Sequence, residues 1–111
     1  MVIYNNIIPF KGFIAINLFG FLFVRKKLKC LVTRELINHE KIHTAQMKEL
    51  LYIGFYIWYL IEWLIRLILV KDSIKAYRMI SFEVEAYKEQ DNLDYLKNRK
   101  HFSWYEIFKK I

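Results

Sequence analysis

The sequence predicts an α+β protein that is mainly helical, with short N-terminal antiparallel strands followed by about three main helices. Apolar residues in the first 30 positions are interrupted by Asn5-Asn6, Pro9, Gly12 and Gly20, a pattern typical of short strands joined by turns. After residue 30 the sequence contains no proline and a single glycine, Gly54, which favours long helices there. A chain of 111 residues suits one domain.

We expect three regions within that domain. The run from Gly20 to Val24 is the best strand candidate in the first of them. Asp72-Ser73 offers a helix cap, and we expect a last long helix from about Ser73 to about Asp91. The three regions are a strand or hairpin region over 1–30, a helical core over 33–91, and a tail over 92–111 with a short helix around 104–109.

Composition narrows the class of protein. A hydrophobic content of 56% excludes disorder for nearly all of the chain. The net charge of +7 includes a basic cluster from Arg25 to Lys29, but we find no nucleic-acid-binding module and expect no nucleic-acid partner. Cys30 is the only cysteine, and the N-terminus does not resemble a secretory signal. We therefore expect a location in the cytoplasm or at the cytoplasmic face of a membrane.

The chemistry of the chain is indicated by the motif His39-Glu40-Lys41-Ile42-His43, on a helix that Thr33 is expected to cap. On a helix, His39 and His43 project from one face and can hold one metal ion. Zinc suits imidazole ligands and lowers the pKa of a bound water to about 7. Glu40 is then the expected general base, which takes a proton from that water.

A catalytic zinc site needs a third protein ligand. The later helix offers Glu83 and Glu85, which are separated by about 200° around a helix and cannot both face the metal. We expect Glu83 to be the ligand and keep Glu85 as the alternative. Two other functions stay open: a non-catalytic module that zinc stabilises, and a membrane-associated interaction protein in which the motif is accidental.

These residues resemble the gluzincin group of zinc peptidases, in which a downstream helical glutamate joins the two histidines of HExxH. The stretch Glu83 to Tyr87 is similar to the Glu-x-x-Ala-Asp element of membrane-associated families within that group, with Tyr87 in place of the aspartate. That match implies Glu83 as ligand, whereas matching Glu85 with Glu89 implies Glu85. More loosely, the chain resembles small bacterial zincin-like proteins with an Asn-His-Glu-x-x-His motif, which implies a single zincin-like domain.

The resemblance also implies a peptide or protein substrate, held by backbone pairing with an edge strand that precedes the active helix. Phe21, Leu22, Phe23 and Val24 would form that strand. Candidates for stabilising the tetrahedral intermediate or supporting a ligand are Tyr77, Arg78, Tyr87 and His101.

Residues 50–70 are almost wholly apolar and long enough to cross a membrane, with Glu62 and Arg66 as the only charges. One straight helix from His43 through this segment would leave Glu83 too far away to reach the metal. The chain should therefore bend around Gly54 and fold residues 56–69 back as a central helix. So many apolar residues predict peripheral membrane contact or formation of a homo-oligomer through this segment.

Overall fold

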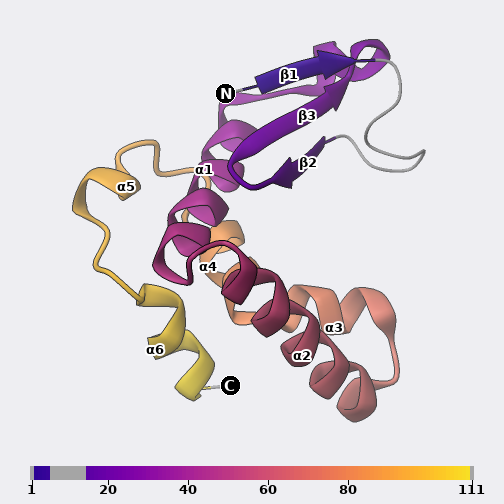
Figure 1. Ribbon diagram of the computed structural model, residues 1–111, viewed down its shortest axis with the longest axis vertical. Helices are drawn as coiled ribbons and strands as arrows, with labels where there is room; N and C mark the ends of the chain where they lie inside the picture. The colour runs from indigo at the N-terminus through magenta and orange to yellow at the C-terminus, as the bar shows by residue number, and fades with distance from the viewer. Residues whose placement is uncertain (1, 6–14, 111) are drawn as a thin grey trace.

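The computed structural model describes residues 2–5 and 15–110 (Figure 1). It confirms an α+β protein that is mainly helical, with a small N-terminal sheet. The elements are β1 (Val2–Asn5), β2 (Ala15–Leu18), β3 (Phe21–Arg25), the 3-10 helix η1 (Lys26–Leu31), α1 (Arg34–Glu49), α2 (Ile53–Val70), α3 (Ser73–Met79), α4 (Ser81–Glu89), α5 (Tyr95–Asn98) and α6 (Ser103–Lys110).

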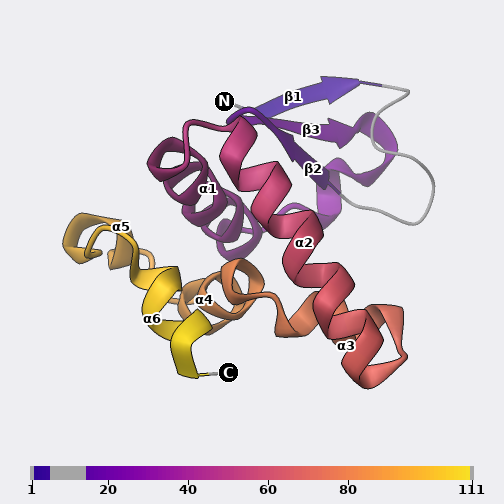
Figure 2. The same ribbon diagram turned by 60° about the horizontal axis from the view of Figure 1, so that its bottom comes forward.

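The sheet is mixed, whereas the sequence predicts antiparallel strands. Its order is β1-β3-β2, with β3 antiparallel to β2 and parallel to β1. The prediction that Phe21–Val24 is an edge strand is therefore wrong, because β3 has a neighbour on each side and its backbone groups are already paired. Two buried residues of β3, Leu22 and Val24, agree with a central position. Among the described residues, β2 forms the edge that faces α1 and α2 (Figure 2).

A bend between α1 and α2 confirms the predicted turn, a few residues before Gly54. Leu51 and Tyr52 take positive φ angles of 56° and 63°, which break the helix. Gly54 lies in the first turn of α2, and its amide donates to the carbonyl of Leu50. In Figure 2, α2 starts beside the end of α1 and runs from there to α3.

The prediction that residues 56–69 form a central helix is wrong, because α2 lies at the surface. By length and composition it could cross a membrane, yet only 17% of its residues are buried. Its buried positions are Phe55, Glu62 and Arg66. Glu62 and Arg66 form the expected pair, with 3.6 Å between Oε2 and the guanidinium, and the pair faces the protein interior. A chain of this size has too few other helices and strands to cover α2 on all sides.

The predicted long helix over 73–91 is divided at Ile80 into α3 and α4. Ile80 has an extended conformation, with ψ at 131°. The Glu62 carboxylate accepts hydrogen bonds of 2.6 Å from both the amide and the hydroxyl of Ser81. Glu62 therefore caps α4 from another helix, in place of a local capping side chain.

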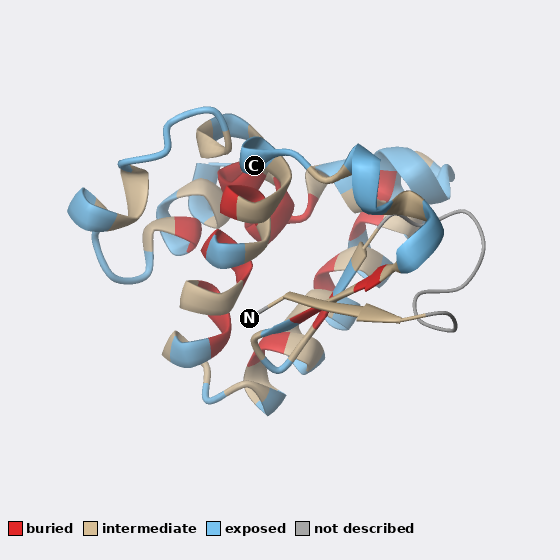
Figure 3. Ribbon diagram, turned by 90° about the horizontal axis from the view of Figure 1, so that it is seen from above, coloured by how far each residue is buried: buried red, intermediate tan, exposed pale blue. Residues whose placement is uncertain are grey.

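The segment predicted as a tail is packed onto the core. Trp104 of α6 is 2% exposed and contacts Phe82 and Trp58. With Met47, Phe55 and Ile80, Trp104 and Phe82 form the hydrophobic core cluster. Most buried residues lie on helices, as the red segments of Figure 3 show.

Candidate metal centre

Helix α1 carries both histidines on its buried face. Thr33 caps it as predicted, accepting a hydrogen bond of 3.1 Å from the Leu36 amide. His39 and His43 are each 5% exposed and lie one turn apart, as the i, i+4 spacing predicts. Their Nε2 atoms are 3.1 Å apart.

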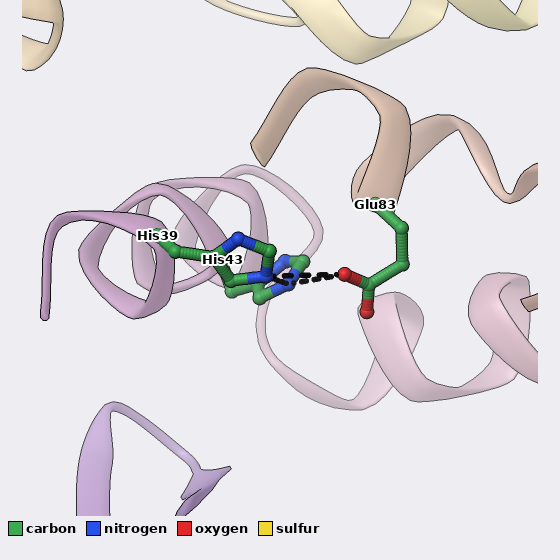
Figure 4. A group of neighbouring side chains, drawn as sticks. All are labelled: His39, His43 and Glu83. Carbon is green, nitrogen blue, oxygen red and sulfur yellow. Dashed lines mark hydrogen bonds and ion pairs between the residues drawn. The ribbon is translucent and has the colours of Figure 1, made fainter. Parts of the chain in front are cut away.

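Glu83, in the first turn of α4, completes the cluster (Figure 4). Its Oε1 lies 3.2 Å from Nε2 of His39 and 3.1 Å from Nε2 of His43. The three donor atoms lie within 4.8 Å of one another, and all three residues are buried, so the group could bind a metal ion. Such separations fit donors that share one ion through bonds of about 2.0–2.1 Å.

The other candidate ligand, Glu85, points away from the histidines. Its carboxylate accepts hydrogen bonds from Gln46, Tyr95 and Arg99. Arg99 also forms a 2.9 Å ion pair with Glu49, which joins the C-terminal segment to α1. Glu85 therefore belongs to a buried ionic network behind the site.

Each member of the cluster is fixed by a second contact. Nδ1 of His39 lies 2.9 Å from Oε1 of Gln90, and Nδ1 of His43 lies 2.8 Å from Oε1 of Gln46. Both Nε2 atoms are thereby directed toward Glu83. The second oxygen of Glu83 accepts a 2.7 Å hydrogen bond from the Tyr59 hydroxyl. Such outer contacts orient metal ligands and fix the tautomer of a histidine.

The sequence reasoning missed these three supporting residues. Gln46 follows His43 by three positions, so it lies on the same face of α1 as His43. Gln90 follows Glu83 by seven positions, so it lies on the same face of α4 as Glu83, the face that is directed toward His39. That spacing could have identified them. Tyr59 has no such local signal, because it reaches the site from α2.

Electrostatics favour charge in the metal-free cluster. Burial lowers the pKa of His43, but the charge and hydrogen bond of Glu83 outweigh burial and raise this pKa to about 9. For Glu83, burial acts to raise the pKa, yet the neighbouring histidines hold it well below its usual range. At neutral pH the raised pKa favours a protonated His43, whose charge balances that of Glu83 in the metal-free cluster.

Metal binding should consequently depend on pH. Zinc must displace the proton of His43, so we expect zinc affinity to fall by about tenfold for each unit by which the pH drops below about 9. In the metal-free chain the same raised pKa contributes stability that is complete below about pH 6.5 and is lost as the pH rises through about 9. Titrations of the chain against a competing chelator at several pH values measure the first effect. A zinc affinity that does not change over this range would contradict it.

Glu40 lies beside the three donors and lines the same cavity. Among the described residues its carboxylate has no hydrogen-bond partner, whereas its backbone carbonyl accepts hydrogen bonds from Asn17 and Thr44. Burial raises the pKa of Glu40, and the two histidines oppose that rise. An unpaired carboxylate with a raised pKa beside a metal-binding cluster is suited to accept a proton.

A cavity of about 490 Å³ opens in front of the cluster. The edge strand β2 forms one wall of it. Asn17 attaches that strand to α1, since its Nδ2 lies 2.9 Å from both the Glu40 carbonyl and the Thr44 hydroxyl. The remaining lining residues come from α1, α2, α3 and α4, and they are His39, Glu40, His43, Met47, Phe55, Tyr56, Tyr59, Tyr77 and Glu83.

Of the four remaining candidates, only Tyr77 lines this cavity, and its hydroxyl lies 2.9 Å from that of Tyr87. Burial and the charge of Glu83 raise the pKa of Tyr77, so the hydroxyl keeps its proton and can donate it in a hydrogen bond. The ring of Tyr87 packs against His39, with centroids 4.6 Å apart. Arg78 is exposed and stacks over the Tyr87 ring. His101 is distant from the site, with an exposed side chain near Glu49.

Comparisons of the chain with protein-family models, with curated proteins and with solved structures found no match. The likeness to gluzincin peptidases therefore rests on the motif residues of the sequence. The candidate metal centre is a geometric finding: α1 and α4 bring Glu83 beside His39 and beside His43, which precedes it by 40 residues in the chain.

Proposed function

We propose that this chain is a small zinc-dependent peptidase, with His39, His43 and Glu83 as the ligands of the metal. The main support is that three buried donor atoms converge at a cavity that Glu40 also lines. Two imidazoles and a carboxylate are a ligand set that catalytic zinc sites use, with a fourth position left for water.

When bound, zinc would lower the pKa of a water molecule toward neutrality and polarise the carbonyl of a substrate. Glu40 would accept a proton from the water as its oxygen attacks the peptide carbonyl carbon, and would return that proton to the amine nitrogen as the C–N bond breaks. The Tyr77 hydroxyl, at the wall of the cavity, is the candidate for donating a hydrogen bond to the developing oxyanion.

The strand that could hold a substrate is β2, because residues 21–24 belong to the central strand of the described sheet. β2 lines the cavity and is an edge strand of the described sheet, so an extended peptide could pair with its backbone there, in exchange for the hydrogen bond that the Asn17 carbonyl accepts from Tyr56. The mostly apolar and aromatic walls favour a peptide with apolar side chains. An exposed Cys30 with no disulfide fits the expected location in the cytoplasm or at the cytoplasmic face of a membrane.

The test is hydrolysis of a peptide library by the zinc-loaded chain, with cleavage products identified by mass spectrometry. We expect products that disappear when zinc is removed with a chelator and return when zinc is supplied. A zinc-loaded chain that cleaves nothing in the library would favour the alternative, a non-catalytic module that zinc stabilises.

A further inference from the structure

Helix α2 has an exposed stripe made only of aliphatic side chains. These residues are between 44% and 74% exposed and recur at intervals of one, three and four positions, so that they occupy one half of the helix circumference. Every residue of α2 that is exposed belongs to this set, so the exposed face of the helix has no polar or charged residue. We call this set the aliphatic stripe, and its members are Ile53, Ile57, Leu60, Ile61, Leu64, Ile65, Ile68 and Leu69.

The polar residues of α2 are directed inward. Glu62 is 2% exposed and Arg66 is 8% exposed, and Glu62 is fully occupied by Arg66, Trp58 and Ser81. A surface helix in water normally has the reverse arrangement, with its apolar face in the core and its charges in solvent. An outward aliphatic face with inward, paired charges is what a hydrocarbon environment requires.

We propose that the aliphatic stripe inserts into one leaflet of a lipid bilayer, with α2 lying along the membrane surface. The stripe runs the length of the helix, about 27 Å for 18 residues. A large contiguous apolar patch on a protein surface marks an interaction site. Two more aliphatic side chains that lie just before and just after α2 in the chain are also exposed, Leu51 at 83% and Ile74 at 71%.

The chemistry of the stripe favours lipid over a second protein surface. Protein interfaces combine an apolar centre with aromatic residues, arginine and a polar rim, whereas the stripe contains only Ile and Leu. Charge also suits an anionic leaflet: Lys48 is exposed just before the bend, and Lys71 and Lys75 are exposed beyond the other end of α2. Cations at both ends of an apolar face are typical of helices that lie at an anionic interface.

A position along the surface agrees better with the fold than a span across the membrane. The opposite side of α2 packs against α1 and α3, and it contacts α4 through Phe82 and Ser81. Helix α1 exposes charged residues such as Lys41 and Lys48 that cannot enter hydrocarbon. Phe55, Tyr56 and Tyr59 of the same helix line the cavity of the metal centre. The docked helix would therefore hold that cavity close to the membrane surface.

The test is flotation of the full chain with vesicles of phosphatidylcholine, alone or mixed with phosphatidylglycerol. We expect the chain to float with both and more strongly with the anionic mixture. The double variant Ile61→Asp/Ile68→Asp should reduce partitioning by at least roughly tenfold. The matched control Leu31→Asp/Leu93→Asp adds the same charge at side chains that are 49% and 48% exposed elsewhere, and it should float like the wild type.

Three outcomes would overturn the proposal. In the first, the wild type fails to float with either vesicle. In the second, both double variants lose binding equally. In the third, the chain does not bind vesicles and sediments as a dimer that Ile61→Asp/Ile68→Asp converts into a monomer, which would assign the stripe to a second copy. Zinc content measured for every variant is independent of this result, so it reports separately on folding and on the metal centre.

Discussion

Glu40→Gln should abolish peptide hydrolysis while the chain keeps its zinc. Glutamine has nearly the same shape but cannot accept the proton, so we expect the rate to fall by about 10²- to 10⁴-fold, the usual contribution of a general base. Metal binding should persist because Glu40 is not among the three converging donors. Rates on a library-derived peptide and zinc content by elemental analysis measure the two effects on one sample.

The matched control is Glu106→Gln, which makes the same chemical change at an exposed position of α6, and it should leave both quantities unchanged. An unchanged rate in Glu40→Gln would remove the role of general base from this residue. Loss of zinc in the same variant would mean that Glu40 supports the metal cluster instead.

Glu62→Ala should produce the largest loss of stability. It leaves the buried Arg66 without its partner and removes the acceptor for the Ser81 amide and hydroxyl at the start of α4. Breaking a buried ion pair from one side costs about 3–5 kcal/mol, a large part of the roughly 5–15 kcal/mol that holds a typical domain folded. Urea denaturation followed by tryptophan fluorescence gives the difference in the free energy of unfolding.

Asp94→Ala is the control for that measurement, because it breaks an ion pair with Lys97 in which both side chains are more than 70% exposed. We expect that change to stay within about 0.5 kcal/mol. If Glu62→Ala cost no more than Asp94→Ala, the capping of α4 by Glu62 would not contribute to stability.

Local rules predicted much of the metal cluster. The i, i+4 spacing of His39 and His43 fixes them on one face of α1, and the spacing of Glu83 and Glu85 allows only one of them to face the histidines. The predicted bend around Gly54 is confirmed at Leu51 and Tyr52, and it is needed because a straight helix would separate Glu83 from α1. These inferences need only helix geometry.

Inferences that depend on distant parts of the chain failed. The strand over residues 21–25 has a neighbour on each side because β1 pairs with it in parallel, in addition to β2. The residues of the strand itself do not predict that parallel partner. The break at Ile80 depends on Glu62, which lies 19 residues away from Ser81. The central position predicted for residues 56–69 was wrong because too few other elements surround α2 to bury it, and only 17% of its residues are buried.

Zinc content of the purified chain, compared among the wild type, Glu83→Gln and Glu85→Gln, tests the central claim most directly. We predict about one zinc per chain in the wild type and in Glu85→Gln, because Glu85 binds Arg99 and Gln46 and does not face the histidines. Glu83→Gln should lose the metal. Two results would contradict the assignment of His39, His43 and Glu83 as a zinc centre. The wild type could stay free of zinc after zinc is supplied, or Glu85→Gln could lose the metal while Glu83→Gln keeps it.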